Sequence, residues 1–160
     1  MKTLAAIVLL SCCALAQDKT AISRAEAGCG PQDAQFEVKT ESRHPAPAPE
    51  PRKALIYFVA DGHFTSIFGV DGKWMGAASG GRYFFVPIDP GEHHVCAMLQ
   101  SISKGFEVSV HSLKAEPGGT YYFRTRMVGI NAGFVLQLAQ LDPDEGKWFI
   151  DSMTMSAPTP

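Results

Sequence analysis

The chain has 160 residues, of which 46% are hydrophobic and 19% are charged, and its formal net charge at pH 7 is −2. This length is enough for one domain and marginal for two. The small net charge gives no electrostatic case for binding nucleic acid, and no polybasic patch for binding a membrane surface. Fifteen glycines and eleven prolines predict many turns, and therefore a β-rich chain rather than a helical one.

Residues 1–16 have the features of a signal peptide. One lysine precedes the apolar run LAAIVLL, and Ala-Leu-Ala at 14–16 fits a cleavage site with small residues. The run is too short to cross a bilayer as a mature helix. We therefore expect export and a mature chain that begins at Gln17. Two alternatives are a buried N-terminal helix and a lipoprotein signal, Leu-Leu-Ser-Cys, in which Cys12 carries the lipid.

The cysteine count becomes informative once the signal peptide is removed. Two of the four cysteines lie within that peptide, and cleavage leaves Cys29 and Cys96. Two cysteines in an exported chain most simply form one disulfide. The bridge would close a loop of about 67 residues and stabilise the fold by roughly 4 kcal/mol in the chain-entropy model. The alternative is a pair of buried free thiols.

Residues 17–53 are predicted to be an irregular segment followed by a connector. The stretch ISRAEAG at 22–28 could form one short helix. Phe36 and Val38 alternate with polar residues, as in a short edge strand. Residues 40–52 are rich in proline, which favours an extended polyproline II connector.

Residues 54–151 are predicted to form the main domain, an all-β antiparallel β-sandwich. About eight short strands alternate with turn signals roughly ten residues apart, and no long helix is evident. The expected strand segments are 54–60, 66–70 and 73–76 around an Asp71-Gly72 turn, 83–88, 93–99, a half-exposed strand at 106–111, 120–128 and 134–141. Residues 77–81 are expected to be loop, 142–146 a turn, 147–150 the last segment of the domain, and 152–160 a flexible tail.

The stretch YFFVPIDPGEHHVCAML at 83–99 is the expected centre of the domain. It predicts a hairpin of two strands joined by a Pro90-Gly91 turn, with φ above zero at Gly91. The first strand is apolar on both faces, which is typical of a central strand covered on both sides. Pro87 then requires a position where no ladder hydrogen bond is needed from its nitrogen.

The order of these motifs resembles the domain of unknown function 2846 family. The resemblance rests on ALIYF, Val-Asp-Gly, YFFVPIDPGEHHVC, KAEPGGTYYFRTR and DPDEGKWFI, and it covers about 54–150. It implies an exported bacterial β-sandwich protein, in some members a lipoprotein, and it supplies no catalytic residues. The upstream sequence AGCGP is similar to a subgroup whose two cysteines match Cys29 and Cys96. The Pro-Gly-x-His turn also resembles that of PEGA-type surface domains.

No constellation in the sequence predicts catalysis or a metal centre. His93 and His94 are adjacent on a strand and face opposite sides, and no histidine pair has ligand spacing. His94, Cys96 and Met98 share one strand face and are residue types that bind copper, but a disulfide would occupy Cys96. His93 is expected to cap the Pro-Gly turn through the backbone. The acidic residues at 142–145 are expected to be a solvated turn.

Tyr122, Arg124 and Arg126 form the candidate binding face. They share one face of the 120–128 strand, and two guanidinium groups beside an aromatic ring could bind an anionic glycan or the carboxylates of a partner. The alternative is a solvated strand face with acidic cross-strand neighbours. The sequence thus predicts an exported, non-enzymatic module of the cell envelope, periplasmic or secreted. It is expected to use no cofactor or metal, to bind an envelope protein or glycan, and to reach a membrane only if lipidated.

Overall fold

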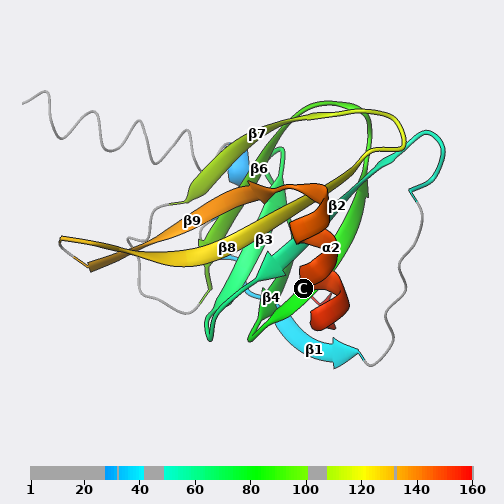
Figure 1. Cartoon of the computed structure of the whole chain (residues 1–160). Coiled ribbons are helices and arrows are strands. Elements are labelled where there is room, and N and C mark those ends of the chain that lie inside the picture. Colours follow the sequence, from blue (N-terminus) through cyan, green and yellow to red (C-terminus); the bar gives the residue numbers. More distant parts are fainter. Residues whose placement is uncertain (1–27, 32, 42–48, 101–107, 132, 160) are drawn as a thin grey trace, which may run out of the picture.

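The computed structural model describes residues 28–31, 33–41, 49–100, 108–131 and 133–159. This part of the chain forms two β-sheets packed face to face, with one short helix against the larger sheet (Figure 1). The all-β sandwich expected from the sequence is therefore confirmed. No helix in the described part is long and apolar enough to cross a membrane. The predicted signal peptide, residues 22–27 of the predicted 22–28 helix and most of the proline-rich connector lie outside the described residues.

The larger sheet has six strands in the order β1-β10-β5-β2-β8-β9, and the smaller has four in the order β4-β3-β6-β7. Most neighbours are antiparallel, but β2 is parallel to β8 and β10 is parallel to β5. The bounds are β1 Glu37–Glu41, β2 Ala54–Ala60, β3 Thr65–Val70, β4 Lys73–Ser79, β5 Arg82–Ile88, β6 Gly91–Leu99, β7 Ser109–Ala115, β8 Thr120–Ile130, β9 Gly133–Leu141, α2 Pro143–Ser152 and β10 Thr154–Thr159.

The main core lies between the two sheets and is built around four phenylalanines. Phe58, Phe84 and Phe123 come from the larger sheet and Phe68 comes from the smaller one, and each is at most 3% exposed. The rings of Phe58 and Phe68 are 4.9 Å apart between centroids, a separation at which offset aromatic pairs attract. Because side chains alternate along each strand, the same strands also present a second face outward.

The outer face of the larger sheet is covered by α2. Tyr57, Tyr83 and Tyr122 form an aromatic layer there, against which Phe149 and Ile150 of the helix pack. The tyrosine rings lie close together, with 5.2 Å between the centroids of Tyr57 and Tyr122. Burial, together with the neighbouring tyrosines, raises the pKa of Tyr57 to about 12. The helix thus completes a second, smaller core on the far side of the sheet.

The C-terminal region differs from its prediction. The 142–146 turn and the segment after it form α2, whose N-cap Asp142 accepts hydrogen bonds from the backbone nitrogens of Asp144 and Glu145. Pro143 occupies the first turn, where its missing N–H costs nothing. The expected flexible tail forms β10, which lies between β1 and β5 in the larger sheet. The sandwich therefore extends beyond 54–151 at both ends.

The expected central hairpin is also wrong, because β5 and β6 lie in different sheets. β5 pairs with β2 in the larger sheet, whereas β6 pairs with β3 and β7 in the smaller one. The Asp-Pro-Gly turn therefore carries the chain across the sandwich, with Gly91 at φ 145°. As predicted, β5 packs with one face on the main core and with the other on the aromatic layer. Its second strand neighbour, β10, pairs with it only at Arg82 and Tyr83. Pro87 thus lies where β5 has one strand neighbour.

Two further strand predictions need correction in detail. Residues 77–79, expected to be loop, belong to β4, and the turn is limited to Gly80 and Gly81. β7 begins at Ser109 and presents Leu113 and Ala115 to the core, so that Val110 faces outward. By contrast, the Asp71-Gly72 turn is confirmed, since both residues have positive φ, as a type I′ hairpin requires.

Candidate interaction surface

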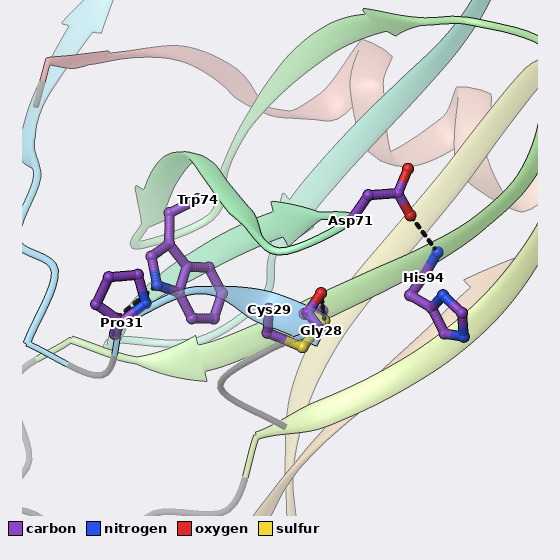
Figure 2. The surroundings of a disulfide bond; sticks show 7 residues. Gly28, Cys29, Pro31, Asp71, Trp74 and His94 are labelled. Carbon is purple, nitrogen blue, oxygen red and sulfur yellow. Dashed lines mark hydrogen bonds between the residues drawn. A yellow bond between two sulfur atoms is a disulfide. The ribbon is translucent and has the colours of Figure 1, made fainter. Parts of the chain in front are cut away.

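Cys29 and Cys96 form the disulfide expected from the sequence (Figure 2). Their Cα atoms are 5.7 Å apart, and both residues are fully buried. Cys96 projects from β6 on the outer face of the smaller sheet, together with Met98. The bridge therefore fastens the N-terminal segment to that outer face, 67 residues away along the chain.

Trp74 fixes the same N-terminal segment to the smaller sheet. Its indole lies between Gly30 and Gly69, where an added Cβ would be 2.9 Å and 2.8 Å, respectively, from ring carbons. The indole Nε1 donates a hydrogen bond of 2.6 Å to the carbonyl of Pro31 (Figure 2). The backbone N–H of Gly72 donates to the carbonyl of Gly28 over 2.6 Å. Glycine is required at both faces of the ring because a side chain would occupy the space of the indole.

Gln100 extends this attachment towards β1. Its side-chain Oε1 accepts a hydrogen bond of 3.0 Å from the N–H of Phe36, and its Nε2 donates one of 2.9 Å to the carbonyl of the same residue. The amide thus satisfies both backbone groups of Phe36, as a neighbouring strand would. Together with Ala34 and Val38, Phe36 packs on the cluster around Cys96. The protein itself therefore covers the outer face of the smaller sheet around Cys96, whereas Val110 on β7 is exposed.

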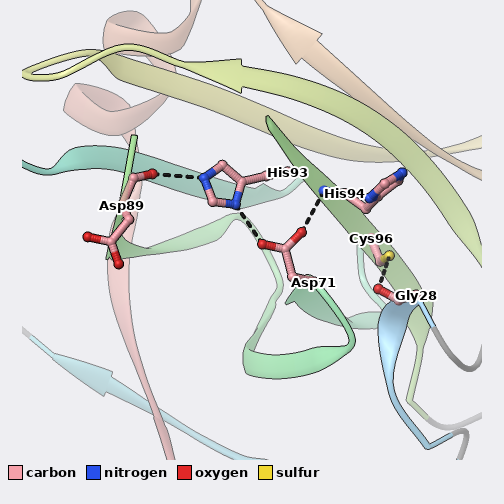
Figure 3. A network of polar contacts seen from close by, with 6 residues as sticks. All are labelled: Gly28, Asp71, Asp89, His93, His94 and Cys96. Carbon is pink, nitrogen blue, oxygen red and sulfur yellow. Dashed lines mark hydrogen bonds and ion pairs between the residues drawn. The ribbon is translucent and has the colours of Figure 1, made fainter. Parts of the chain in front are cut away.

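A polar clamp connects the β3–β4 turn to the crossover between the sheets (Figure 3). His93 Nδ1 lies 2.6 Å from Asp71 Oδ2, and His93 Nε2 lies 2.8 Å from the carbonyl oxygen of Asp89. Asp71 Oδ1 also accepts a hydrogen bond of 2.8 Å from the backbone N–H of His94. The expected contact of His93 with the backbone of the Pro-Gly turn is therefore present.

The partners of His93 indicate its charge. A carboxylate and a carbonyl oxygen both accept hydrogen bonds, so both ring nitrogens donate only when the imidazole is protonated. Burial by itself lowers the pKa of His93, but the hydrogen bonds to Asp71 and Asp89 and the charge of Asp71 raise it above the usual 6.5. Burial raises the pKa of Asp71, yet the bonds from His94 and His93 lower it overall below 3.8. The clamp is thus an ion pair in mildly acidic solution.

The predicted face of Tyr122, Arg124 and Arg126 is not an open surface. The three residues do share one side of β8, but α2 covers Tyr122, which is 7% exposed. Arg124 pairs with Asp61 through Nη2, and its Nη1 lies 3.7 Å from Glu145 Oε1. Its guanidinium carbon lies 4.5 Å from the centroid of the Phe149 ring.

The third residue of that face has a different environment. Arg126 is exposed, and its Nε donates a 2.8 Å hydrogen bond to Gln137 Oε1 on β9. Two of the three predicted side chains therefore hold α2 against the sheet, and one faces solvent.

The other candidate side chains also have structural partners. Cys96 is in the disulfide and Met98 is 5% exposed, so the N-terminal segment closes their strand face at these two residues, whereas His94 on the same face is exposed. In the described part of the chain, no group of three His, Cys, Asp or Glu residues is placed to hold a metal ion. The acidic residues at 142–145 cap α2 and meet Arg124 rather than converging on one point.

The exposed apolar side chains gather at one end of the sandwich, which we call the apolar end. Among the described residues, five large hydrophobic side chains are exposed, and the four that define the apolar end are Phe64, Val110, Ile130 and Phe134, at 46%, 47%, 52% and 67%. The fifth, Trp148, lies on α2. Phe64 lines a small pocket with Met127 and Leu136, and Val110 lines a groove with Val128 and Val135. Both features border the β8–β9 hairpin.

The hairpin itself reaches beyond the rest of the larger sheet. The last residue of β2, Ala60, pairs with Thr125, whereas β8 continues to Ile130. In Figure 1 the yellow and orange strands extend past the others at the left. Residues 127–136, MVGINAGFVL, contain no charged residue. Exposed apolar patches on folded proteins commonly mark interaction sites.

This surface was not predicted, although a signal was present in the sequence. By its local pattern, the uncharged run is typical of two ordinary strands and their turn. The sequence alone does not show that β8 extends beyond the end of its parallel neighbour β2, because that pairing joins residues more than 60 positions apart.

Among known proteins, no family model, no curated protein and no solved structure matches this chain.

Proposed function

We propose that the protein is an exported, non-enzymatic β-sandwich module of the bacterial cell envelope that acts by binding a partner at the apolar end. The observation that carries the proposal is the gathering of Phe64, Val110, Ile130 and Phe134 around one uncharged hairpin. Exposed aliphatic and aromatic side chains lose unfavourable hydration when a partner covers them, at about 25 cal/mol per Å². The rest of the described surface has no comparable group of large apolar side chains.

Export is part of the proposal and draws support from the cysteines. A buried disulfide between Cys29 and Cys96 suits an oxidising compartment, that is, the periplasm or the exterior. In this proposal residues 1–16 are the signal peptide and the mature chain begins at Gln17. The resemblance to the domain of unknown function 2846 family belongs to the same proposal. The alternative is a structural lipoprotein that is anchored to a membrane by lipid on Cys12.

The proposal of a non-enzymatic role rests on how the titratable side chains are used. Both ring nitrogens of His93 are engaged by Asp71 and Asp89, which leaves neither free to accept a proton from a substrate. Arg124 is engaged by Asp61, Glu145 and Phe149. These groups support the fold, so a protein partner at the apolar end is favoured over an anionic glycan on β8. Nucleic acid is not an expected partner, because the net charge is −2.

Site-specific photo-crosslinking in the exporting bacterium tests this function. A benzophenone amino acid at position 130 should form crosslinks in intact cells, and the same residue at position 39 of the charged β1 strand should form few. Ile130 and Lys39 are both exposed; Lys39 lies on one edge strand of the larger sheet and Ile130 lies next to the other edge strand, so they form a matched pair. Equal yields at the two positions, or none at position 130, would contradict the proposal. Mass spectrometry of the crosslinked species identifies the partner.

A further inference from the structure

The two edges of the larger sheet are protected to very different degrees. β1 forms one edge and has the sequence EVKTE, with exposed Glu37, Lys39 and Glu41 and an ion pair of 3.1 Å between the first two. β9 forms the other edge and has the sequence GFVLQLAQL, with no charge and no proline. Natural sheets protect their edges with charges, prolines or short strands, because an open edge accepts another strand. β9 has none of these three features.

The open part of β9 can be located from one hydrogen bond. The N–H of Leu138 points away from β8 and donates to Ser109 Oγ over 2.9 Å. Backbone groups alternate in direction along a strand, so those of Phe134 and Leu136 point to the same side. In the described part of the chain, β9 is the last strand of its sheet. Among the described residues, the edge is thus occupied by β7 at Leu138 and open over 133–137.

A groove runs along this open stretch. It has a volume of about 360 Å³ and is lined mainly by the side chains of Val108, Val110, Val128 and Val135. An extended segment lying in the groove could pair with the edge and cover these valines at the same time. Strand addition of this kind combines main-chain hydrogen bonds with apolar side-chain contacts.

We propose that this edge pairs with the same edge of a second copy of the chain, so that two larger sheets join across a two-fold axis at Val135. This inference rests on the proposed function and names the partner at the apolar end. In the antiparallel arrangement Val135 lies opposite the partner's Val135, and Phe134 lies opposite the partner's Leu136. These central pairs are apolar, and the backbone groups of Phe134 and Leu136 gain hydrogen-bond partners. An interface of this type is self-complementary, as a closed dimer requires.

Charge explains why the dimer uses β9 and not β1. The same operation on β1 would place Lys39 opposite the partner's Lys39, and Glu37 opposite the partner's Glu41. Like charges directly opposite each other on neighbouring strands are destabilising. A lipid bilayer is a poorer occupant of the apolar end, because the open backbone groups of the hairpin would have no hydrogen-bond partners in hydrocarbon.

Analytical ultracentrifugation of the disulfide-bonded, exported protein tests the inference. We expect a reversible monomer–dimer equilibrium. Val135→Lys and Val135→Glu should each weaken the dimer by at least about 100-fold, because each places like charges at the axis. Val135 is partly exposed, so the fold should survive either change. The control Thr40→Lys adds the same charge to an exposed position of β1 and should leave the dimer unchanged.

The two weakened variants should pair with each other. An equimolar mixture of Val135→Lys and Val135→Glu should restore the dimer, because opposite charges then meet at the axis. A wild-type protein that stays monomeric at roughly 1 mM would overturn the inference, as would a dimer that tolerates both variants. A monomer that floats with phosphatidylglycerol vesicles through the hairpin would also overturn it and assign the surface to lipid. A crosslink from position 130 to another protein alone would leave the proposed function standing without the dimer.

Discussion

Gly146 on α2 lies directly against the ring of Tyr122 on β8. A Cβ at position 146 would be 2.7 Å from the Tyr122 Cβ and would overlap the ring itself. The glycine therefore sets how closely the helix approaches the larger sheet. The close approach also brings Phe149 over the aromatic layer and within reach of Arg124. Glycine normally destabilises a helix, but at position 146 it is required for α2 to pack against the larger sheet.

Gly146→Ala should consequently destabilise the protein. In an ordinary helix this change stabilises by about 1 kcal/mol, but here the added methyl group overpacks the interface, and we expect a net loss of about 1–3 kcal/mol. Urea unfolding measures the change in free energy. Lys147→Ala, at an exposed position of the same helix, should change stability by less than about 0.5 kcal/mol. A more stable Gly146→Ala variant would mean that α2 does not dock as described.

Local signals predicted the strands well and the C-terminal region poorly. The alternation of Tyr121, Phe123, Thr125 and Met127 with polar or aromatic neighbours gave β8 its two faces, and the Asp-Gly pair gave the β3–β4 turn. For α2 the N-cap Asp142 is visible in the sequence, but the acidic residues and glycine at 142–146 are equally typical of a turn. β10 has weak strand propensity, and it forms because β1 and β5 lie on either side of it. Neither neighbour is close to it in sequence.

In the candidate site, too, the features signalled by the sequence itself could be predicted and those set by long-range packing could not. The pairing of Cys29 with Cys96 could be predicted because the other two cysteines lie in the predicted signal peptide. The contacts of Arg124 could not, since Asp61 and Glu145 come from two distant segments that converge only in the folded chain. Long-range packing also decides that Arg126 is exposed although it shares a strand face with Arg124.

Arg124 and Arg126 allow this distinction to be measured. Arg124→Ala removes the ion pairs to Asp61 and Glu145 and the contact with Phe149. We expect it to lower the free energy of unfolding by about 1–3 kcal/mol. Arg126→Ala removes one exposed hydrogen bond and should change it by less than about 0.5 kcal/mol. Circular dichroism during urea titration compares the two variants. Similar losses, or a larger loss for Arg126→Ala, would contradict the structural role of Arg124.

The clamp of His93 and Asp71 should make stability depend on pH. The pKa of His93 is raised in the folded state, so its contribution is fully present below about 6.5 and is lost as the pH rises through the folded value. The pKa of Asp71 is lowered, so its contribution is present above about 3.8 and is lost as the pH falls through its folded value. The clamp is therefore most stabilising between these two limits, in mildly acidic solution.

His93→Gln isolates this effect. The difference in melting temperature between wild type and variant should be largest between about pH 5 and pH 6 and should shrink above the raised pKa of His93. We expect the loss in free energy of unfolding to be only about 1 kcal/mol at its maximum, because Asp71 is half-exposed and solvent screens its charge. His94→Gln is the control, since the clamp uses only the backbone N–H of that residue. A difference that does not vary with pH would show that His93 is uncharged in the clamp.

The disulfide should hold the N-terminal segment more than the core. The double variant Cys29→Ser, Cys96→Ser removes a bridge worth up to about 4 kcal/mol in the chain-entropy model. The main core lies on the other side of the smaller sheet and has its own apolar residues, so the strands should remain folded. Residues 28–36 should loosen, because Trp74 and Gln100 are then their principal attachments. Loosening of this segment would uncover the indole of Trp74.

Fluorescence can follow that indole directly. The chain has two tryptophans, and Trp148 is already 64% exposed, so Trp148→Phe leaves Trp74 as the single reporter. Trp74 is 8% exposed in the folded protein. In a chain that begins at Gln17, loss of the bridge should shift its emission to longer wavelength and increase quenching by acrylamide, while the far-ultraviolet circular dichroism stays that of a β-sheet. Reduction of the parent under mild denaturation should give the same shift. Unchanged emission would mean that packing alone holds the segment, and a collapse of the β-sheet signal would mean that the bridge supports the whole sandwich.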